Sequence, residues 1–273
     1  MKELAGKTAV VTGAAGGIGR ALALGFAAEG MHLALADIEE AGLERTRRDA
    51  AAAGVNAAAM RLDVSKAGEV ESFAASLREV HVVCNNAGVS PLGAAWEYSV
   101  AEWHWILGVN LWGVIHGVRA FAPRLIAQNE GHIVNTASVA GLISPPGMAA
   151  YSATKHAVVA LSEALCQDLR ERRSAVGVSV LCPAYVPTAI ADAKPPQEIA
   201  GGVKSQETLA KEAMLRKAVA SGKLSADDVA RAVVAAIKEE RFYVLTHPRI
   251  KPAIRARMED ILEERAPRNP LEL

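Results

Sequence analysis

Tyr151 and Lys155 are the residues of this chain whose types and spacing most directly suggest chemistry. They stand four residues apart in YSATK (151–155), so a helix would place them on one face, although an exposed helix could also carry both by chance. Their ordinary pKa values are about 10 and about 10.4, so neither titrates near neutral pH alone. A positive charge about 4 Å away, at an effective dielectric of about 20, favours a tyrosine anion by about 4 kcal/mol. We therefore interpret Lys155 as the group that makes Tyr151 acidic enough to serve as a base near pH 7 to 8.

A glycine-rich loop, TGAAGGIG (12–19), joins a predicted strand to a predicted helix. Gly13, Gly17 and Gly19 allow a sharp turn, a close approach of backbone N–H groups to a pyrophosphate, and tight packing of the helix on the sheet. A strand before such glycines and a helix after them is typical of a dinucleotide site. The alternative is a glycine-rich turn that holds no ligand.

Asp37 ends the second predicted strand, eighteen residues after Gly19. A carboxylate at this place accepts hydrogen bonds from an adenosine ribose and repels a 2′-phosphate. No arginine or lysine offsets that repulsion at the neighbouring positions, which are Ala14, Ala15, Gly16, Ile38 and Glu39. We therefore predict NAD(H) rather than NADP(H) as the cofactor. The alternative is that Asp37 caps a helix over 39–53.

Short β-rich runs alternate with longer helical segments along the chain. Strands are predicted over 7–12, 32–37, 56–62, 80–84, 132–138, 176–181 and 242–246, and helices over 17–29, 40–53, 66–78, 100–127, 151–172 and 226–239. Several strands are apolar throughout, as in a sheet covered on both faces. The pattern predicts an α/β fold, a Rossmann-type doubly wound parallel sheet of about seven strands with helices on both faces. No linker divides the 273 residues, so we expect one domain over 1–273.

Two segments fall outside this alternation. Residues 188–222 are polar, with a Pro-Pro and a Gly-Gly pair, and are predicted to form a mobile substrate loop that contains a helix. Residues 250–265 place four apolar side chains on one helical stripe: Ile254, Met258, Ile261 and Leu262. We expect this C-terminal helical tail to pack on the domain or on a partner subunit.

The composition argues against several classes of function. Thirty basic and thirty acidic residues leave no net charge, which gives no electrostatic case for nucleic acid or an anionic membrane as partner. No apolar run reaches the ~18 residues of a membrane span, and the N-terminus lacks the apolar core of a secretion signal. Cys84, Cys166 and Cys182 form no CxxC pair, so disulfides are not expected and the cytoplasm is the expected compartment. The seven histidines are scattered, so no metal site is predicted.

Taken in order, these motifs resemble the short-chain dehydrogenase/reductase family in its single-domain form, over roughly residues 4–246. TGAAGGIG resembles the family's cofactor loop, and NNAG (85–88) resembles the segment that ends its fourth strand. The resemblance implies an alcohol dehydrogenase or ketone reductase that acts on CH–OH groups with NAD. It also implies the cofactor-binding residues, which are Gly13, Ala15, Gly17, Ile18, Gly19, Asp37, Asp63, Val64, Asn86, Tyr151, Lys155, Val186 and Thr188.

The same resemblance implies four catalytic residues: Asn110, Ser138, Tyr151 and Lys155. Tyr151 would exchange a proton with the alcohol or carbonyl oxygen, and Ser138 would hydrogen-bond that oxygen. Lys155 would lower the pKa of the tyrosine and hold the nicotinamide ribose, and Asn110 would fix a water that links Lys155 to solvent. Hydride transfer itself is the cofactor's chemistry.

The chain departs from the family pattern at two places. Ala184, in PAYVPT (183–188), replaces the usual glycine after the sixth strand, which narrows backbone freedom there. The segment before the fourth strand is short, and His81 stands where the family has an aspartate. We expect this to shorten a helix or a loop away from the chemistry.

The substrate side is expected to be formed by Ser90, Pro91, Leu92 and Trp96, by Val139 to Met148, by Tyr185 and by the loop 188–222. No arginine or lysine lies between 139 and 150, which favours an uncharged, fairly hydrophobic alcohol or ketone. The four tryptophans (Trp96, Trp103, Trp105 and Trp112) are expected to pack in the core or at a subunit interface rather than to contact substrate. Family members are commonly homotetramers or homodimers joined through the helices 100–127 and 151–172, so we expect a homo-oligomer.

Two other functions stay open. One is a nucleotide-sensing protein without turnover, which the intact tyrosine and lysine disfavour. The other is a sugar-nucleotide epimerase or dehydratase, which usually needs a larger C-terminal lobe than the ~85 residues after Thr188.

Overall fold

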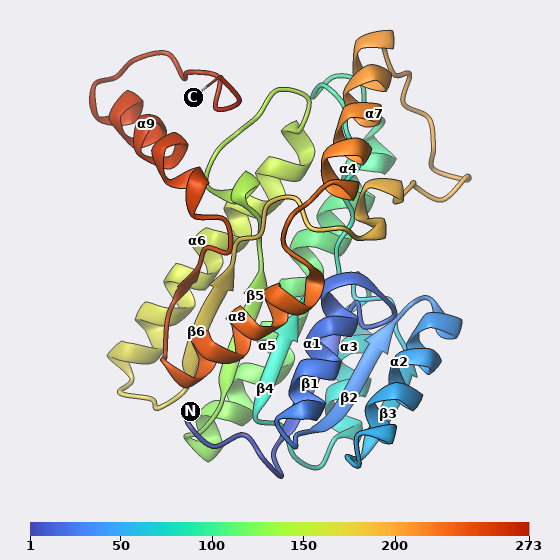
Figure 1. Ribbon diagram of the computed structural model, residues 1–273, viewed down its shortest axis with the longest axis vertical. Coiled ribbons are helices and arrows are strands. Elements are labelled where there is room, and N and C mark those ends of the chain that lie inside the picture. The colour runs from blue at the N-terminus through green and yellow to red at the C-terminus, as the bar shows by residue number, and fades with distance from the viewer. Residues whose placement is uncertain (273) are drawn as a thin grey trace.

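The computed structural model describes residues 1–272 and contains a seven-stranded sheet in the order β3-β2-β1-β4-β5-β6-β7 (Figure 1). Every pair of neighbouring strands is parallel. The strands are β1 Thr8–Thr12, β2 His32–Asp37, β3 Ala57–Arg61, β4 Val82–Asn85, β5 His132–Thr136, β6 Gly177–Leu181 and β7 Tyr243–Val244. The chain winds outward from β1 to β3 and then returns to β4, so the direction of winding reverses between β1 and β4. The predicted doubly wound parallel sheet is confirmed.

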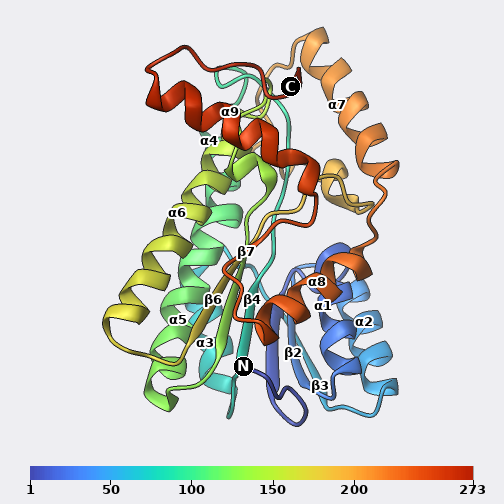
Figure 2. The ribbon, with the colours of Figure 1, turned by 60° about the vertical axis from the view of Figure 1, so that its left-hand side comes forward.

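Helices cover both faces of the sheet. They are α1 Gly17–Ala28, α2 Glu40–Ala52, α3 Ala67–Ser76, α4 Val100–Leu107, α5 Gly113–Gln128, α6 Ala149–Glu171, α7 Gln206–Ala220, α8 Ala226–Lys238 and α9 Lys251–Leu262. In Figure 2, α1, α2 and α8 lie on one side of the sheet and α3, α5 and α6 on the other. One apolar core contains Phe26 of α1 and Ile237 of α8, a second contains Phe73 of α3 and Phe121 of α5, and a third contains Val158 of α6.

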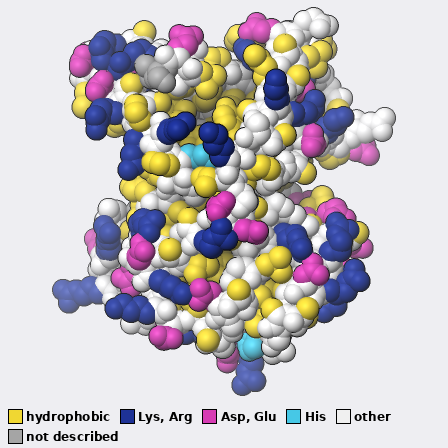
Figure 3. Space-filling model, in the orientation of Figure 1, with side chains coloured by type: hydrophobic (Ala, Val, Ile, Leu, Met, Phe, Trp, Pro, Cys, Tyr) yellow, Lys and Arg dark blue, Asp and Glu magenta, His cyan; other side chains and the backbone are white. Residues whose placement is uncertain are grey.

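A second layer lies above the carboxyl ends of the strands. It contains α4, α7 and α9 with their connecting segments (Figure 1). Figure 3 shows basic and acidic side chains interspersed over one face of the molecule, without a large patch of one sign. Within residues 1–272, no helix is long and apolar enough to cross a bilayer. In a doubly wound sheet, ligands bind outside the carboxyl ends of the strands, so this upper layer is placed to cover a site.

The helix predicted over 100–127 is present and contains a π-helical turn. A π-helical turn, η1 (Gly108–Trp112), separates α4 from α5 and contains Asn110. The side chain of Asn110 holds the backbone of Val89, so the widened turn places a fully buried amide against the segment that follows β4. A sequence pattern of period 3.6 gives no sign of such a turn, and π-helical turns are frequent at functional sites.

The expected packing of the C-terminal stripe on the domain is wrong. The side chains of Met258, Ile261 and Leu262 are exposed, whereas α9 buries Ala253 and Asp260. Asp260 accepts a hydrogen bond from Arg268 Nε at 2.9 Å, which folds the segment after α9 back onto the helix. The apolar stripe therefore faces away from the chain's own core, and the partner-subunit alternative stays a prediction.

The polar interior of the sheet depends on one glycine of α5. Asn85 donates to Asn135 at 2.9 Å, and Asn135 donates to Ser162 at 3.0 Å, which links β4, β5 and α6. Gly117 lies so close to Asn85 that a Cβ atom there would overlap its amide group. Only glycine lets α5 approach the sheet at this point.

We predict that Gly117→Ala lowers the free energy of unfolding by about 1–3 kcal/mol, because the added methyl group overpacks the buried amides. Gly25→Ala is the matched control, since a Cβ at this helical position would meet Ala230 at an ordinary 3.5 Å. This control should gain about 0.5–1 kcal/mol from helix propensity. Urea denaturation measures both, and equal effects of the two substitutions would contradict the packing argument.

Candidate active site

The carboxyl ends of β1 and β4 are tied together by Thr12. Its hydroxyl accepts hydrogen bonds from the N–H groups of Asn86, at 2.9 Å, and Ala87, at 3.2 Å. Its carbonyl accepts from Asn86 Nδ2 at 3.0 Å. Gly13 follows with a φ of +68°, and a Cβ there would lie 2.8 Å from the Cα of Ala87. The glycine loop and the NNAG segment are therefore in direct contact.

The N-terminus of α1 is shaped to receive an anion. Its N-cap, Gly16, makes no side-chain cap, and a Cβ at Gly16 would meet nothing within 4 Å. The N–H groups of a first helical turn lack partners within the helix. The backbone N–H groups of Ile18 and Gly19, in the first turn of α1, are therefore available to a phosphate group. Gly17 has a φ of +52°, and a Cβ there would lie 3.0 Å from Thr188. The residues present fit a dinucleotide, because the loop approaches closely and offers unpaired donors.

Asp37 does not cap α2. Glu39 is the N-cap, and its carboxylate accepts from the N–H groups of Ala41 and Gly42. Asp37 accepts from the N–H of Glu39 itself at 3.0 Å and from the N–H of Ala15 at 2.8 Å, and the second bond holds the glycine loop against the end of β2. The helix-cap alternative is therefore wrong, and Asp37 stays at the edge of the dinucleotide loop.

A basic residue lies closer to Asp37 than the chain neighbours suggested. Arg61, at the end of β3, is the register partner of Asp37 across the β2–β3 ladder. Its Nε lies 3.6 Å from a carboxylate oxygen of Glu40. The sequence does contain a signal for Arg61: it ends β3, as Asp37 ends β2, and parallel pairing of the two strands would place these residues side by side.

The segment of Asp63 and Val64, which is predicted to bind the cofactor, is held by α5. Asp63 accepts from the backbone N–H of Ser65 at 3.0 Å and from its hydroxyl at 2.7 Å. Val64 is buried, and its carbonyl lies 3.0 Å from His116 Nδ1. A Cβ at Gly113 would lie 2.7 Å from Val64, so this helix presses directly on the segment.

Ser138, Tyr151 and Lys155 come together in the structure. Tyr151 and Lys155 lie one turn apart on α6, with 6% and 2% of their surfaces exposed. Lys155 Nζ donates to the carbonyl of Thr136 at 2.8 Å and lies 5.6 Å from the centroid of the Tyr151 ring. Ser138 follows β5, and its hydroxyl donates to the carbonyl of Pro183 at 3.3 Å and accepts from the N–H of Ala140 at 3.1 Å. The same hydroxyl is near enough to Tyr151 to lower the pKa of its phenol. A hydroxyl, a phenol and a cation are thus held in one buried cluster.

Asn110 adjoins this cluster through the backbone after β4. Its Oδ1 accepts from the N–H of Val89 at 2.8 Å, and its Nδ2 donates to the carbonyl of Val89 at 2.8 Å. A Cβ at Gly88 would lie 3.3 Å from Asn110 Oδ1 and 3.6 Å from Lys155 Nζ. Asn110 therefore fixes the strip of backbone that passes beside the lysine.

Burial has the largest effect on the pKa values of Tyr151 and Lys155. It raises the pKa of Tyr151 to about 12, while the hydrogen bond with Ser138 acts in the opposite direction. It lowers the pKa of Lys155 to about 8. The expected lowering of the Tyr151 pKa by Lys155 is therefore wrong for the protein alone. Desolvation has the larger effect, so Tyr151 is a protonated phenol at neutral pH.

The loop after β6 accommodates alanine at position 184. Ala184 is not among the residues with a left-handed backbone, so glycine is not required. Its N–H donates to His247 Nδ1 at 3.2 Å. Val186 is buried, and Thr188 lies beside Gly17. His81, the other departure, pairs its backbone with Thr8 at the opposite end of the sheet, away from this site.

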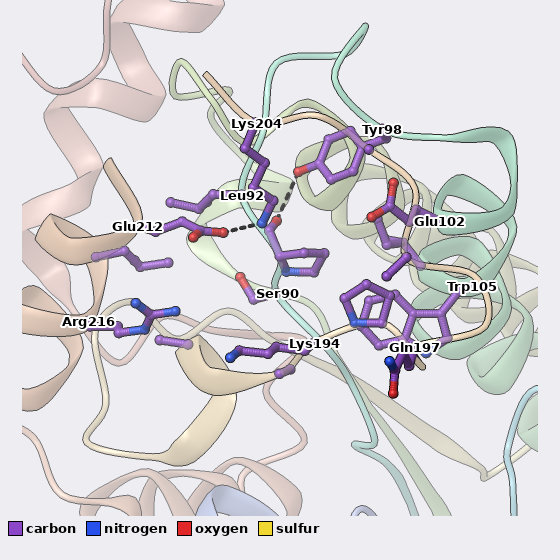
Figure 4. Close-up of a pocket in the computed structure, with 18 residues that line it drawn as sticks. Ser90, Leu92, Tyr98, Glu102, Trp105, Lys194, Gln197, Lys204, Glu212 and Arg216 are labelled. Carbon is purple, nitrogen blue, oxygen red and sulfur yellow. Dashed lines mark hydrogen bonds and ion pairs between the residues drawn. The ribbon is translucent and has the colours of Figure 1, made fainter. Parts of the chain in front are cut away.

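A pocket of about 380 Å³ lies beyond this cluster, under the second layer (Figure 4). As predicted, Ser90, Pro91 and Leu92 line it together with the segment 188–222. Val139 to Met148, Trp96 and Tyr185 do not line this pocket, and Trp96 is 86% exposed, so their contact with substrate stays a prediction. Trp105 lines the pocket, contrary to the expectation for the tryptophans. Sequence reasoning also missed the charged lining side chains, which are Glu102, Lys194, Lys204, Glu212 and Arg216.

Glu97 fastens the covering helix α7 to the rest of the site. Its carboxylate accepts from the N–H of Ser205 at 3.0 Å, the hydroxyl of Thr208 at 2.5 Å and the N–H of Ala94 at 2.9 Å. Hydrogen bonds from Ser205 and Thr208 lower the pKa of Glu97 to about 2. The carboxylate therefore stays ionised and keeps the start of α7 in place throughout the neutral range.

We predict that Lys155→Met stabilises the fold at pH 7 by up to about 3 kcal/mol, less the lost hydrogen bond to Thr136, because it removes a buried cation. The unfolded chain binds more protons at this lysine than the folded chain between pH 8 and 10.5. The cost of burying the ammonium group is thus complete below pH 8 and declines as pH rises.

Urea denaturation of both proteins checks this. The gain should fall to roughly half at pH 9.5. Lys217→Met, at an exposed position of α7, is the control and should show no such pH dependence. The argument would be contradicted if Lys155→Met were less stable than the parent at pH 7 and by the same amount at pH 9.5.

Comparisons with known proteins agree with this geometry. Residues 7–199 match the family model for short chain dehydrogenases. A short chain dehydrogenase/reductase from Burkholderia phymatum, solved in complex with NAD, is 50% identical over the full length of both chains, with a TM-score of 0.96. A CLA biosynthesis dehydrogenase/reductase of Lactiplantibacillus plantarum is 32% identical and covers 98% of this chain and 97% of its own. An alcohol dehydrogenase from the archaeon Thermococcus sibiricus, complexed with 5-hydroxy-NADP, is 30% identical over 88% of this chain and 95% of its own, with a TM-score of 0.72. The chain belongs to the short-chain dehydrogenase/reductase family.

Proposed function

We propose that this protein is an NAD(H)-dependent oxidoreductase that interconverts a secondary alcohol and a ketone. The observation that carries the proposal is the buried cluster of Ser138, Tyr151 and Lys155 beside an uncapped dinucleotide loop. Family membership and the NAD bound in the Burkholderia phymatum relative support it. The intact tyrosine and lysine disfavour a nucleotide sensor without turnover.

Tyr151 is the proton-transfer group of the proposed reaction. In the reducing direction its phenol, protonated at neutral pH, donates to the carbonyl oxygen of the substrate, and Ser138 hydrogen-bonds the same oxygen. In the oxidising direction Tyr151 must first lose its proton. The charges that favour this loss are the Lys155 ammonium group and the positive nicotinamide ring. When bound, NAD supplies the hydride donor or acceptor.

The residues proposed to bind the cofactor lie at or after the carboxyl ends of the strands. Gly13, Ala15, Gly17, Ile18 and Gly19 hold the pyrophosphate, and Asp37 holds the adenosine ribose. Asp63, Val64 and Asn86 lie along the adenine and ribose side of the cofactor site. Val186 and Thr188 contact the nicotinamide carboxamide, and Lys155 holds its ribose. The segment 188–222 serves as the substrate loop.

The exposed apolar side chains of α9 and of η1, where Trp112 is 51% exposed, support a homo-oligomer, either a dimer or a tetramer. The cytoplasm is the proposed compartment.

We predict that Tyr151→Phe lowers kcat by about 10²–10⁴-fold, because it removes the transferable proton. Absorbance at 340 nm, with NAD⁺ and a panel of cyclic, aromatic and aliphatic secondary alcohols, measures the rate. NADH affinity, measured by fluorescence titration, should stay within a few fold. Tyr243→Phe on β7 is the control and should keep the parental rate. Full activity of the Tyr151 variant would overturn the assignment.

We predict that kcat/KM is at least about 100-fold higher with NAD⁺ than with NADP⁺, because the Asp37 carboxylate repels a 2′-phosphate. Asp37→Ser should reduce this ratio by tenfold or more, since it removes the repelling carboxylate at a position that is in register with Arg61 across the ladder. Steady-state kinetics with both cofactors gives the ratio. A parent enzyme that prefers NADP⁺ would show that the interpretation of Asp37 is wrong.

A further inference from the structure

The pocket lies close to the catalytic cluster along the backbone that follows β4. A Cβ at Gly88 would lie 3.6 Å from Lys155 Nζ, and Ser90, two residues later, lines the pocket. Two residues of extended chain span at most about 7 Å. A substrate whose reacting carbon lies beside Tyr151 therefore extends into the pocket within a few bonds.

Two of the pocket's cations have free donors. Lys204 is paired with Glu212, and Glu102 is engaged by the backbone N–H of Ser99, 2.7 Å away. Lys194, by contrast, has no acidic partner within residues 1–272. Arg216 Nε lies 3.3 Å from a carboxylate oxygen of Asp192, and the terminal nitrogens of Arg216 donate no hydrogen bond to another residue within 1–272.

These two cations lie on the same side of the pocket. In Figure 4 the charged ends of Lys194 and Arg216 lie toward Ser90 and away from Trp105. Apolar side chains, among them Leu92, Ile106 and Leu215, make up much of the remaining wall. A mainly apolar pocket with a few convergent polar groups is the usual form of a small-molecule site, and the polar groups fix the orientation of the ligand.

We infer that the substrate is a hydroxy or keto carboxylate, whose carboxylate binds between Lys194 and Arg216 while its alcohol or ketone reaches Tyr151. The inference rests on the proposed function and replaces the uncharged substrate that the segment 139–150 had suggested. Arginine and lysine bind carboxylates through charge-assisted hydrogen bonds, which are stronger than neutral ones.

The charge balance of the pocket favours a monoanion over a phosphate dianion. Three lining cations, Lys194, Lys204 and Arg216, face two lining carboxylates, Glu102 and Glu212, which leaves one positive charge. Asp192 lies outside the lining, and its pairing with Arg216 is screened by water and salt, since the two side chains are 68% and 45% exposed. One surplus charge matches one carboxylate.

The test compares ketone acids with their amides, which have nearly the same shape and no charge. The pairs are 4-oxopentanoate and 4-oxopentanamide, 4-acetylbenzoate and 4-acetylbenzamide, and 3-oxocyclohexanecarboxylate and its amide. Calorimetry with the NADH-loaded protein gives Kd, and NADH oxidation gives kcat/KM. We expect at least one acid to bind about tenfold or more tightly than its amide, with the ratio falling as NaCl rises.

The variants are Lys194→Gln, Arg216→Gln and both together. The double variant should lose the preference for the acid while its affinity for the amide stays unchanged. Lys217→Gln is the matched control, since Lys217 is the next residue of α7, is exposed and does not line the pocket. It changes the charge of the helix by the same amount and should keep the preference.

Each outcome separates this inference from the proposed function. If the amides bind or react as well as the acids, or if no pair binds while NADH does, the carboxylate inference is overturned. An equal loss of preference in the Lys217 variant would also overturn it, because a general field would then explain the effect. If the acids bind selectively but Tyr151→Phe changes no rate, the proposed reaction fails and the carboxylate site stands.

Discussion

The burial of an ammonium group beside a phenol is the constraint on which the rest of this site depends. Lys155 is 2% exposed and keeps one protein acceptor, the carbonyl of Thr136. A charge in such surroundings is costly unless it is paired, and that cost lowers its pKa to about 8. The destabilising ammonium group lies beside Tyr151, the proposed proton-transfer residue. Functional sites commonly lower the stability of a fold in this way.

Neighbouring elements are arranged around that buried cation. Thr136 ends β5 and presents its carbonyl, while the π-helical turn between α4 and α5 carries Asn110 to the backbone beside Lys155. Gly88 lets that backbone pass close to the ammonium group. The same backbone continues to Ser90, which lines the pocket. The same few contacts therefore set both the position of Lys155 and the surroundings that lower its pKa.

The sequence was sufficient for features that depend on local chemistry. The parallel sheet follows from strand–helix alternation, and the sharp turn at Gly13, which has a φ of +68°, follows from glycines at the end of a first strand. The one-turn spacing of Tyr151 and Lys155 likewise needs only a helix. Such features are encoded within a few residues, and for that reason single motifs identify them.

Features that depend on long-range packing were missed. Arg61 lies beside Asp37 only because β2 and β3 are in register, and Arg216 reaches the pocket only because α7 folds over it. The direction of the Tyr151 pKa was also wrong, because a sequence shows the nearby charge but not the degree of burial. Desolvation is a property of the assembled fold, so no spacing rule could have supplied it.

The central claim is that Tyr151 is a buried neutral phenol until a positive charge is added beside it. The measurement that tests it most directly is a pH titration of tyrosinate absorbance at 295 nm, as the difference between the parent and Tyr151→Phe, with and without saturating NAD⁺. The account predicts no Tyr151 tyrosinate below pH 10 in the protein alone, and a signal below about pH 9 in the NAD⁺ complex. Titration at the same pH in both states would contradict it.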